Sequence, residues 1–580
     1  MKNYKNKIFI LIGLAAVILV SCRKHETFPV QDVTIQYVFD PRDSAGANAL
    51  NFLLNVYSVV PYGHNRVNPD YLDAASDDAV SSGQGTEVSI LSTGTYNSIT
   101  LPSYENLWSN TNSTNTANCW NGIRYANEFI NNIGVVPVKG FYNGIGTRYI
   151  WRNEARFLRA YFYFELLKRF GGIPLIGNQV FNINNNLNIP RSSFSDCVNY
   201  IVSECTSMQD SLITIPLANP ASDNYRATKG AALALKAKVL LYAASPLFND
   251  PTGSNTNPLT GYTNYDATRW ATAAAAAQAV INLGGYSLDP VYTNVFATQN
   301  DPEIIFVRTA NEGTPGYSIE TDNAPVGYPA AIGNGQTSPT QDLVNAFPMS
   351  NGLPITNAAS GYDPSNPYNN RDPRLNFNIL HNGSPWLSTS LQTYEGGESK
   401  PDNGQQQTLT GYYMNKFMGN DAIGSTFAGH DEDWVVFRYA DILLDYAEAT
   451  NESSGTPGVT VYAQLEALRS RAGIAAGSNG TYGLTPNMTQ AQMRVAIQNE
   501  RRIEMPFEEQ RYFDIRRWKI ADSVMNAPRM GVSITNSNGA LTYNYVQVLA
   551  TKFIAPKMYL YPIPYTEVVA NSSMKQNPGW

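Results

Sequence analysis

The fold class is decided by one segment, Asn153-Glu154-Ala155-Arg156-Phe157-Leu158-Arg159-Ala160-Tyr161-Phe162-Tyr163-Phe164-Glu165-Leu166-Leu167. Over residues 150–169 the apolar side chains leave little polar face, which is typical of a helix buried on most sides. Gly171-Gly172 and then Pro174 follow, as expected just past the C-terminus of a helix. The segment therefore predicts a long helix inside the core of a mainly α-helical protein.

Helical spacing of apolar residues recurs on both sides of this segment. It predicts further helices at residues 45–60, 120–133, 194–213, 226–244, 267–283, 436–451, 459–472, 488–505 and 508–519. Two long stretches, 62–117 and about 284–435, lack this spacing, and in the second Ile304-Ile305-Phe306-Val307 predicts a short strand. Helix pairs joined by short turns suggest solenoid-like stacking of the tetratricopeptide type. We expect the irregular stretches to pack across that scaffold as a large loop-rich face.

The N-terminus is typical of an export signal. Lys2, Lys5 and Lys7 precede an apolar run from 8 to 20 that is too short to span a bilayer comfortably. Leu19-Val20-Ser21-Cys22 resembles the bacterial lipobox, in which the cysteine carries the acyl chains, palmitate among them. We therefore expect residues 1–21 to be a signal peptide and Cys22 to be lipidated. The alternative is an ordinary signal peptide with a coincidental cysteine.

Charge and length set limits on the function. Loss of residues 1–21 removes three lysines and no acid, which takes the formal net charge from -7 to -10. A nucleic-acid-binding protein needs a basic footprint, so nucleic acid is not an expected partner. Polar residues interrupt every later apolar run, and no further membrane span is expected. The body should therefore be an exported domain that only its lipid holds to a membrane.

Cysteine and histidine are sparse. Besides Cys22 only Cys119, Cys197 and Cys205 are present, so at most one disulfide could form. On one helix Cys197 and Cys205 would lie about two turns apart, too far for a bridge, and free buried thiols are predicted. The four histidines are not spaced for metal binding, which argues against a histidine metal site or triad.

Eight segments match a known family in order along nearly the whole chain. They are Asn153–Tyr161, Phe170–Leu175, Ala227–Ala237, Asn370–Arg374, Arg438–Leu444, Glu500–Glu504, Arg511–Trp518 and Gln576–Trp580. Together with the lipobox they resemble the SusD/RagB family of nutrient-binding outer-membrane lipoproteins. The chain departs from the family pattern at Glu509, where glycine is common, and at Pro506, which should kink or end a helix. Only one acid follows Cys22 in Arg23-Lys24-His25-Glu26, although the family's surface-export signal is usually acidic.

The resemblance implies a scaffold of about four helix pairs, with the ligand held by loops outside it. It implies an N-terminal region at 22–230 and a C-terminal region at 231–580 that form one globular body. It also implies a lipid-anchored, surface-exposed position on the outer membrane and a partner, a SusC-like TonB-dependent transporter that the lipoprotein caps. Members of the family capture glycans, or sometimes peptides, and catalyse nothing.

One predicted helix carries charged residues along a single face. They recur at spacings of three, four and three, at Arg438, Asp441, Asp445 and Glu448. Two such carboxylates could be the acid and base of a glycosidase. The alternative is an ion-pair network with Arg501, Arg502 or Arg511. Asp441 and Asp445 would repel one another unless a cation lay between them, which favours the network.

Aromatic residues within the irregular stretches are the candidate sugar-binding residues. They are Tyr96, Tyr104 and Trp108 in the first stretch and Tyr317, Tyr328 and Trp386 in the second. A sugar ring stacks its C–H face on an aromatic ring, and Asp77 and Asp78 are candidate acceptors for its hydroxyls. The alternative is that each ring anchors its loop to the scaffold. Trp120 and Trp518 lie in predicted helices and are assigned to the core.

The leading hypothesis is a non-catalytic lipoprotein that captures glycans for a transporter. One alternative keeps the architecture and binds oligopeptides, another is a secreted glycoside hydrolase, and a third is a structural lipoprotein without a ligand. No catalytic or metal-binding residue and no cofactor is predicted, although loops rich in Asp and Asn could hold a structural calcium through oxygen ligands.

Overall fold

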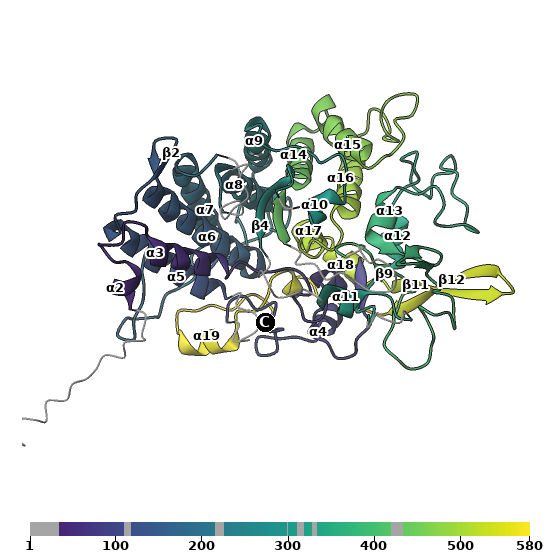
Figure 1. Cartoon of the computed structure of the whole chain (residues 1–580), viewed down its shortest axis with the longest axis horizontal. Helices are drawn as coiled ribbons and strands as arrows, with labels where there is room; N and C mark the ends of the chain where they lie inside the picture. Colours follow the sequence, from purple (N-terminus) through teal and green to yellow (C-terminus); the bar gives the residue numbers. More distant parts are fainter. Residues whose placement is uncertain are drawn as a thin grey trace, which may run out of the picture.

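The computed structural model of the protein describes residues 34–109, 118–214, 226–298, 300–309, 318–327, 333–418 and 433–580. Helices dominate these ranges, and most strands are short (Figure 1). The scaffold helices are α5 (Cys119–Asn132), α6 (Thr147–Phe170), α7 (Phe194–Met208), α8 (Lys229–Ala244), α9 (Thr268–Asn282), α14 (Tyr439–Ser454), α15 (Val459–Arg471) and α16 (Gln490–Glu504). They pack in chain order from α5 to α14, and α14 also contacts α15 and α16. The scaffold thus groups into four pairs, α5–α6, α7–α8, α9–α14 and α15–α16, which confirms the predicted mainly α, helix-pair architecture.

Shorter elements decorate this scaffold. The remaining helices are α2 (Ile35–Val38), α3 (Ala47–Tyr57), α4 (Glu87–Thr93), α10 (Asn294–Ala297), α11 (Ser318–Asn323), α12 (Gln341–Ala346), α13 (Arg374–Asn378), α17 (Gln510–Arg517), α18 (Ala521–Met525) and α19 (Tyr565–Ala570). The strands pair antiparallel: β1 (Ala79–Ser81) with β5 (Thr337–Pro339), β2 (Phe141–Tyr142) with β3 (Ile145–Gly146), β4 (Ile304–Arg308) with β10 (Trp434–Arg438), β6 (Ile379–Leu380) with β9 (Tyr413–Met414), β7 (Pro385–Trp386) with β8 (Thr389–Ser390), and β11 (Arg529–Ser537) with β12 (Ala540–Leu549).

The predicted and observed helix ends differ by a few residues, for local reasons. α8 begins at Lys229 because the Thr228 side chain accepts a hydrogen bond from the Ala231 N–H and so forms the N-cap. α14 begins at Tyr439 because the five preceding residues form strand β10, which pairs with β4. The short strand predicted at 304–307 is therefore confirmed, and its partner lies directly before a scaffold helix.

Helix α6 runs through the core, as its sequence predicts. Four of its charged residues, Glu154, Arg159, Glu165 and Arg169, are buried with its apolar ones, and each of the four has an ion-pair partner. Glu154 accepts hydrogen bonds at 2.7 Å from the Arg226 guanidinium and from the Tyr57 hydroxyl. Arg169 donates to Glu105 at 2.7 Å. Because a buried charge is tolerated only when it is paired, these contacts fix α3 and the loop before α5 on α6.

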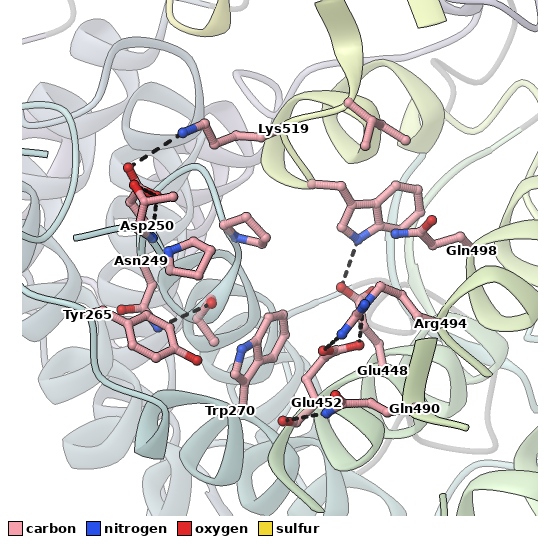
Figure 2. A pocket seen from close by; sticks show the side chains of 16 residues that line it. Asn249, Asp250, Tyr265, Trp270, Glu448, Glu452, Gln490, Arg494, Gln498 and Lys519 are labelled. Atoms are coloured by element: carbon pink, nitrogen blue, oxygen red, sulfur yellow. Dashed lines mark hydrogen bonds and ion pairs between the residues drawn. The ribbon is translucent and has the colours of Figure 1, made fainter. Parts of the chain in front are cut away.

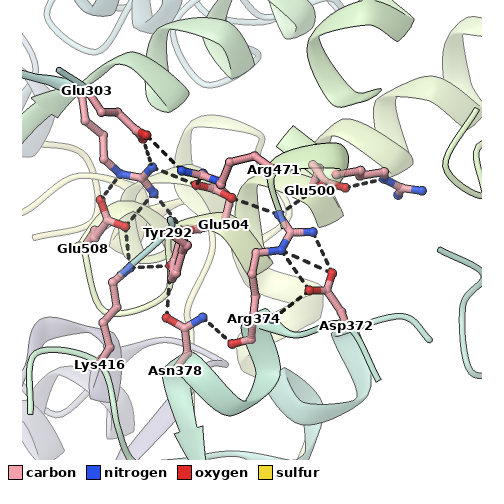
Figure 3. A network of polar contacts seen from close by, with 12 residues as sticks. Tyr292, Glu303, Asp372, Arg374, Asn378, Lys416, Arg471, Glu500, Glu504 and Glu508 are labelled. Atoms are coloured by element: carbon pink, nitrogen blue, oxygen red, sulfur yellow. Dashed lines mark hydrogen bonds and ion pairs between the residues drawn. The ribbon is translucent and has the colours of Figure 1, made fainter. Parts of the chain in front are cut away.

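An ion-pair network ties the long insertion between α9 and α14 to the scaffold (Figure 3). Arg438, at the end of β10, contacts Glu303 at 2.7 Å, Glu504 at 2.8 Å and Glu508 at 2.7 Å. Arg374, at the start of α13, contacts Glu504 at 2.9 Å. Burial alone would raise the pKa of Glu504, but the guanidinium groups of Arg471, Arg438 and Arg374 hold that pKa well below its usual range.

We predict that Arg438→Met lowers the free energy of unfolding by about 3–5 kcal/mol, since it removes the cation that Glu303, Glu504 and Glu508 share and leaves their buried negative charges less compensated. Chemical denaturation followed by circular dichroism measures the change. Arg42→Met is the control, because Arg42 pairs with Asp40 at 2.8 Å but its side chain is 88% exposed. The control should stay within about 1 kcal/mol of wild type. An equal, small effect of both substitutions would contradict a structural role for the network.

The two departures from the family pattern lie in one turn. α16 ends at Glu504, two residues before Pro506, so the expected helix end there is confirmed. Phe507 and Glu509 then adopt left-handed backbone angles, with φ of 63° and 57°. Such a conformation costs a non-glycine residue about 1–2 kcal/mol. The Glu509 carboxylate offsets part of that cost, since it accepts a hydrogen bond from Arg66 at 2.6 Å.

The β11–β12 hairpin was not predicted. It projects from the end of the molecule opposite α2 and α3 (Figure 1). Its turn is Asn538-Gly539, and both residues have positive φ, 54° and 90°. Asn-Gly between alternating segments is a strong hairpin signal, and it would have revealed these strands.

The described cysteines, Cys119, Cys197 and Cys205, are free and buried, which confirms the predicted thiols. Within the described residues, no helix combines the length and the apolar character needed to cross a bilayer.

A buried acid in the first irregular stretch links stability to pH. Asp70 accepts hydrogen bonds from Ser81 and Gln336, but burial outweighs them and raises its pKa from 3.8 to about 7. A carboxyl with a raised pKa stabilises the fold below its unfolded pKa, and that contribution is lost as the pH rises through its folded pKa.

We predict that Asp70→Asn removes this loss of stability at higher pH, because the asparagine side chain stays neutral. Melting temperatures of variant and wild type are measured from about pH 4 to about pH 8. The difference between them should move in favour of the variant as the pH rises. A constant difference would show that Asp70 does not titrate in this range.

Candidate functional site

The structure describes four of the six aromatic candidates. Tyr96, Trp108 and Trp386 are buried, and Tyr104 is partly buried. The Tyr96 ring lies 5.0 Å from that of Trp580, and the Trp108 ring lies 5.2 Å from that of Phe170.

The Trp108 ring therefore holds its loop to α6, as the alternative interpretation stated, and the Tyr96 ring packs on the C-terminal residue Trp580. Because all three rings are buried, their faces are not open to a sugar. Tyr104 has a similar anchoring contact, since its hydroxyl accepts a hydrogen bond from Asn68 at 3.4 Å. Trp120 and Trp518 pack on the scaffold, as expected.

Asp77 and Asp78 do not act as open hydroxyl acceptors, which corrects the expectation for both. Asp77 contacts Arg511 at 2.8 Å and Arg502 at 2.9 Å, and Asp78 contacts Arg502 at 2.6 Å. Both carboxylates are buried. Because they are buried and paired with arginines, these acids join the 62–117 stretch to α16 and α17. Tyr317, Tyr328 and the lipidation candidate Cys22 lie outside the described residues.

The carboxylate stripe on α14 is structural. Lys238 contacts Asp441 at 2.6 Å and Asp445 at 2.9 Å, and Arg501 contacts the same pair at 2.8 and 2.9 Å. The expected cation between the two acids is therefore confirmed, and Arg501 is one of the three arginines named for it. Both acids are buried, so a glycosidic bond could not reach between them.

Among the described residues, a pocket of about 580 Å³ lies where α8, α9, α14, α16 and α17 meet, and we call it the α9–α16 pocket (Figure 2). Its lining includes Asn249, Asp250, Tyr265, Trp270, Glu448, Glu452, Gln490, Arg494, Gln498, Trp518 and Lys519. The volume falls within the range of about 300–1,000 Å³ typical of small-ligand sites.

Aromatic rings lie on both sides of this pocket. Tyr265 is 44% exposed, so its ring is open to a ligand, whereas Trp270 and Trp518 present only part of their surface. The Trp518 indole N–H donates to Glu448 at 2.8 Å. That hydrogen bond fixes the ring before any ligand arrives, so less conformational freedom is lost on binding.

The polar groups of the pocket are arranged in pairs. Arg494 Nε donates to Glu452 at 2.7 Å, and this hydrogen bond raises the pKa of Arg494. The Gln490 amide donates to the Asn451 carbonyl at 2.9 Å. Figure 2 shows Asn249, Asp250 and Tyr265 facing Arg494 and Gln498 across the pocket. Charges compensated inside the pocket and amide groups at its wall suit a neutral ligand that carries many hydroxyls.

Asp250 remains ionised at the rim. Burial opposes this, but hydrogen bonds from Ser254 and Thr252 outweigh burial and lower the pKa of Asp250 to about 2. Lys519, at the end of α17, lies 3.6 Å from its carboxylate.

Another pocket lies beside Trp386. Asn376, His381, Trp386, Leu387 and Asn415 line a depression of about 400 Å³ on the loop-rich face. The depression has polar groups, but its tryptophan is buried, and it offers a sugar less aromatic surface than the α9–α16 pocket. Among the described residues, no group of three or more His, Cys, Asp and Glu could hold a metal ion. The structural calcium stays a prediction.

The sequence did not single out Tyr265 or Trp270, and it placed Trp518 in the core. The run 249–265 between α8 and α9, rich in Asn, Thr and Pro, was the available signal. That run alone does not predict a pocket, because the opposite wall is formed by α14, α16 and α17, which lie far away in the sequence.

Comparisons with family models, with curated proteins and with solved structures agree on one family. A family model described as the SusD family matches residues 302–580, and another, described as starch-binding associating with outer membrane, matches residues 51–241. SusD-like protein P2 of Formosa agariphila is 33% identical over 150 residues, which is 26% of this chain and 26% of that protein. This alignment thus spans about a quarter of the curated relative.

Two solved structures from Bacteroides fragilis share the fold. A SusD-like protein is 25% identical, with a TM-score of 0.74, over 93% of this chain and 98% of that chain. A SusD-like carbohydrate-binding protein is 23% identical, with a TM-score of 0.71, over 92% of this chain and 99% of that chain.

Proposed function

Because this chain belongs to the SusD/RagB family, we propose that it binds glycans at the outer membrane and passes them to a SusC-like TonB-dependent transporter. The α9–α16 pocket is the observation that carries the glycan part of the proposal. It combines an exposed Tyr265 ring with amide groups and internally paired charges. A sugar needs the same combination, an apolar face to stack on and polar groups that read its hydroxyls.

The relatives support this assignment. One matching family description names starch binding and association with the outer membrane, and one relative of the same fold is named a carbohydrate-binding protein. We infer a binder rather than a hydrolase, because the paired acids of α14 are neutralised by Lys238 and Arg501 inside the core.

Binding is tested with purified protein, by affinity electrophoresis against a panel of polysaccharides that includes starch and then by isothermal titration with oligosaccharides. We predict binding to at least one glycan, and a loss of about tenfold or more in affinity for Tyr265→Ala. The magnitude follows from ring stacking, which contributes about 1–3 kcal/mol per ring. The matched control is Tyr149→Ala, since Tyr149 on α6 is 55% exposed and lies outside the pocket.

Three outcomes would contradict the proposal. Binding of oligopeptides with no binding of glycans would select the oligopeptide alternative. Release of reducing ends would identify a hydrolase. If no ligand binds, and deletion of the gene leaves growth on every nutrient normal, the alternative of a structural lipoprotein without a ligand would be selected.

Lipidation of Cys22 and association with the transporter are tested together in native membranes. We predict that the protein extracted from outer membranes in mild detergent carries acyl chains on Cys22 and brings a TonB-dependent transporter with it, both read by mass spectrometry. Cys22→Ser should move the protein to the soluble fraction, because the described body has no membrane-spanning helix to replace the lipid. An unacylated Cys22 in the membrane-bound protein would contradict the anchor.

A further inference from the structure

A second pocket adjoins the α9–α16 pocket. It has a volume of about 440 Å³ and lies between the 254–260 segment and the C-terminal segment around Tyr559 and Pro578; we call it the C-terminal pocket. Asp250 and Lys519 line both pockets, so the two are neighbours on one surface. The Asp250–Lys519 contact lies where the two pockets adjoin.

That contact is weak enough for a ligand to replace. The Lys519 Nζ lies 3.6 Å from the Asp250 carboxylate, longer than a hydrogen bond, and the Lys519 side chain is 39% exposed. The Asp250 side chain is only 7% exposed, so Lys519 is the partner that a ligand can reach. Sugar hydroxyls could accept hydrogen bonds from its ammonium group.

Like the α9–α16 pocket, the C-terminal pocket is lined by both polar and apolar residues. Ser254, Thr256 and Asn257 line it with hydroxyl and amide side chains, and Tyr559 and Pro578 on the C-terminal segment add apolar surface. No Asp or Glu other than Asp250 lines it. Such a surface fits a chain of neutral sugars, with C–H faces on the apolar surface and hydroxyls toward the loop.

The loop between the pockets is already ordered. The Asp250 carboxylate accepts hydrogen bonds from the Thr252 N–H at 3.0 Å and from the Ser254 hydroxyl at 2.7 Å. The Asn255 side chain accepts from the Asn257 N–H at 3.1 Å and donates to the Tyr262 carbonyl at 3.0 Å. A wall built in this way does not have to be ordered by the ligand, which lowers the entropic cost of binding.

We infer that one oligosaccharide chain spans both pockets and crosses the Asp250–Lys519 contact, so that this protein selects extended glycans over short ones. The inference rests on the proposed glycan binding and adds to it a length requirement and a second set of contacts. Thr256 is the residue to test, because it is exposed on the far side of the contact and lines the C-terminal pocket alone.

The test is isothermal titration with a size-fractionated partial hydrolysate of the polysaccharide that the panel identifies, from disaccharide upward. In wild type, the longest fractions should bind about tenfold or more tightly than the shortest fraction that binds. Thr256→Trp narrows the C-terminal pocket with a bulky ring, so it should lower this ratio while the shortest binding fraction keeps its affinity. Lys519→Ala should lower the affinity of the long fractions by a larger factor than that of the shortest binding fraction, because only the long fractions reach both sides of Lys519.

Thr206→Trp is the matched control, since Thr206 is exposed on α7 and lines neither pocket. It should leave both affinities unchanged, and melting curves check that each variant folds. Equal affinity for short and long fractions in wild type would overturn the inference and leave the proposed function standing. An undiminished preference for the long fractions in both Thr256→Trp and Lys519→Ala would also overturn the inference. Failure of every fraction to bind wild type would instead overturn the proposed function itself.

Discussion

The structure depends on buried arginine–carboxylate pairs. Arg438 and Arg374 meet at Glu504, where the insertion between α9 and α14 contacts α16. A charge in the protein interior is stable only beside its counterion, so each pair fixes the position of two segments that lie far apart in the sequence. The loop-rich part of the molecule is irregular in backbone but is held in place by charge at these points.

The same constraint explains why paired acids in this chain do not indicate catalysis. Asp441 and Asp445 lie on one helix face, as an acid–base pair would, yet Lys238 and Arg501 lie against both. Asp77 and Asp78 repeat the pattern with Arg502 and Arg511. The binding pocket that we propose lies at the surface instead, where α14, α16 and α17 bring Glu452, Arg494 and Trp518 opposite the 249–265 loop. There the charges are already paired, which suits a neutral ligand.

Much of the helical scaffold could be predicted, because a helix buried on most sides, such as α6, has apolar residues around most of its circumference. The Asn538-Gly539 turn is an equally local signal, and it is sufficient to predict the hairpin. The aromatic residues of the loops were harder to interpret. A ring that anchors a loop and a ring that binds sugar have the same sequence surroundings, and Tyr96 and Trp108 proved to be anchors.

The sequence by itself determined the scaffold helices, the free thiols and the existence of a charge network, since each follows from spacing or composition within a short stretch. It also determined the family, through eight short segments in a fixed order along the chain. Only the tertiary structure decided which arginine neutralises which acid and which rings stay exposed. It also decided that Tyr265, Glu452 and Trp518, from three distant parts of the chain, line one pocket. The reason is physical: burial and ion pairing belong to contacts between segments, and no single segment contains them.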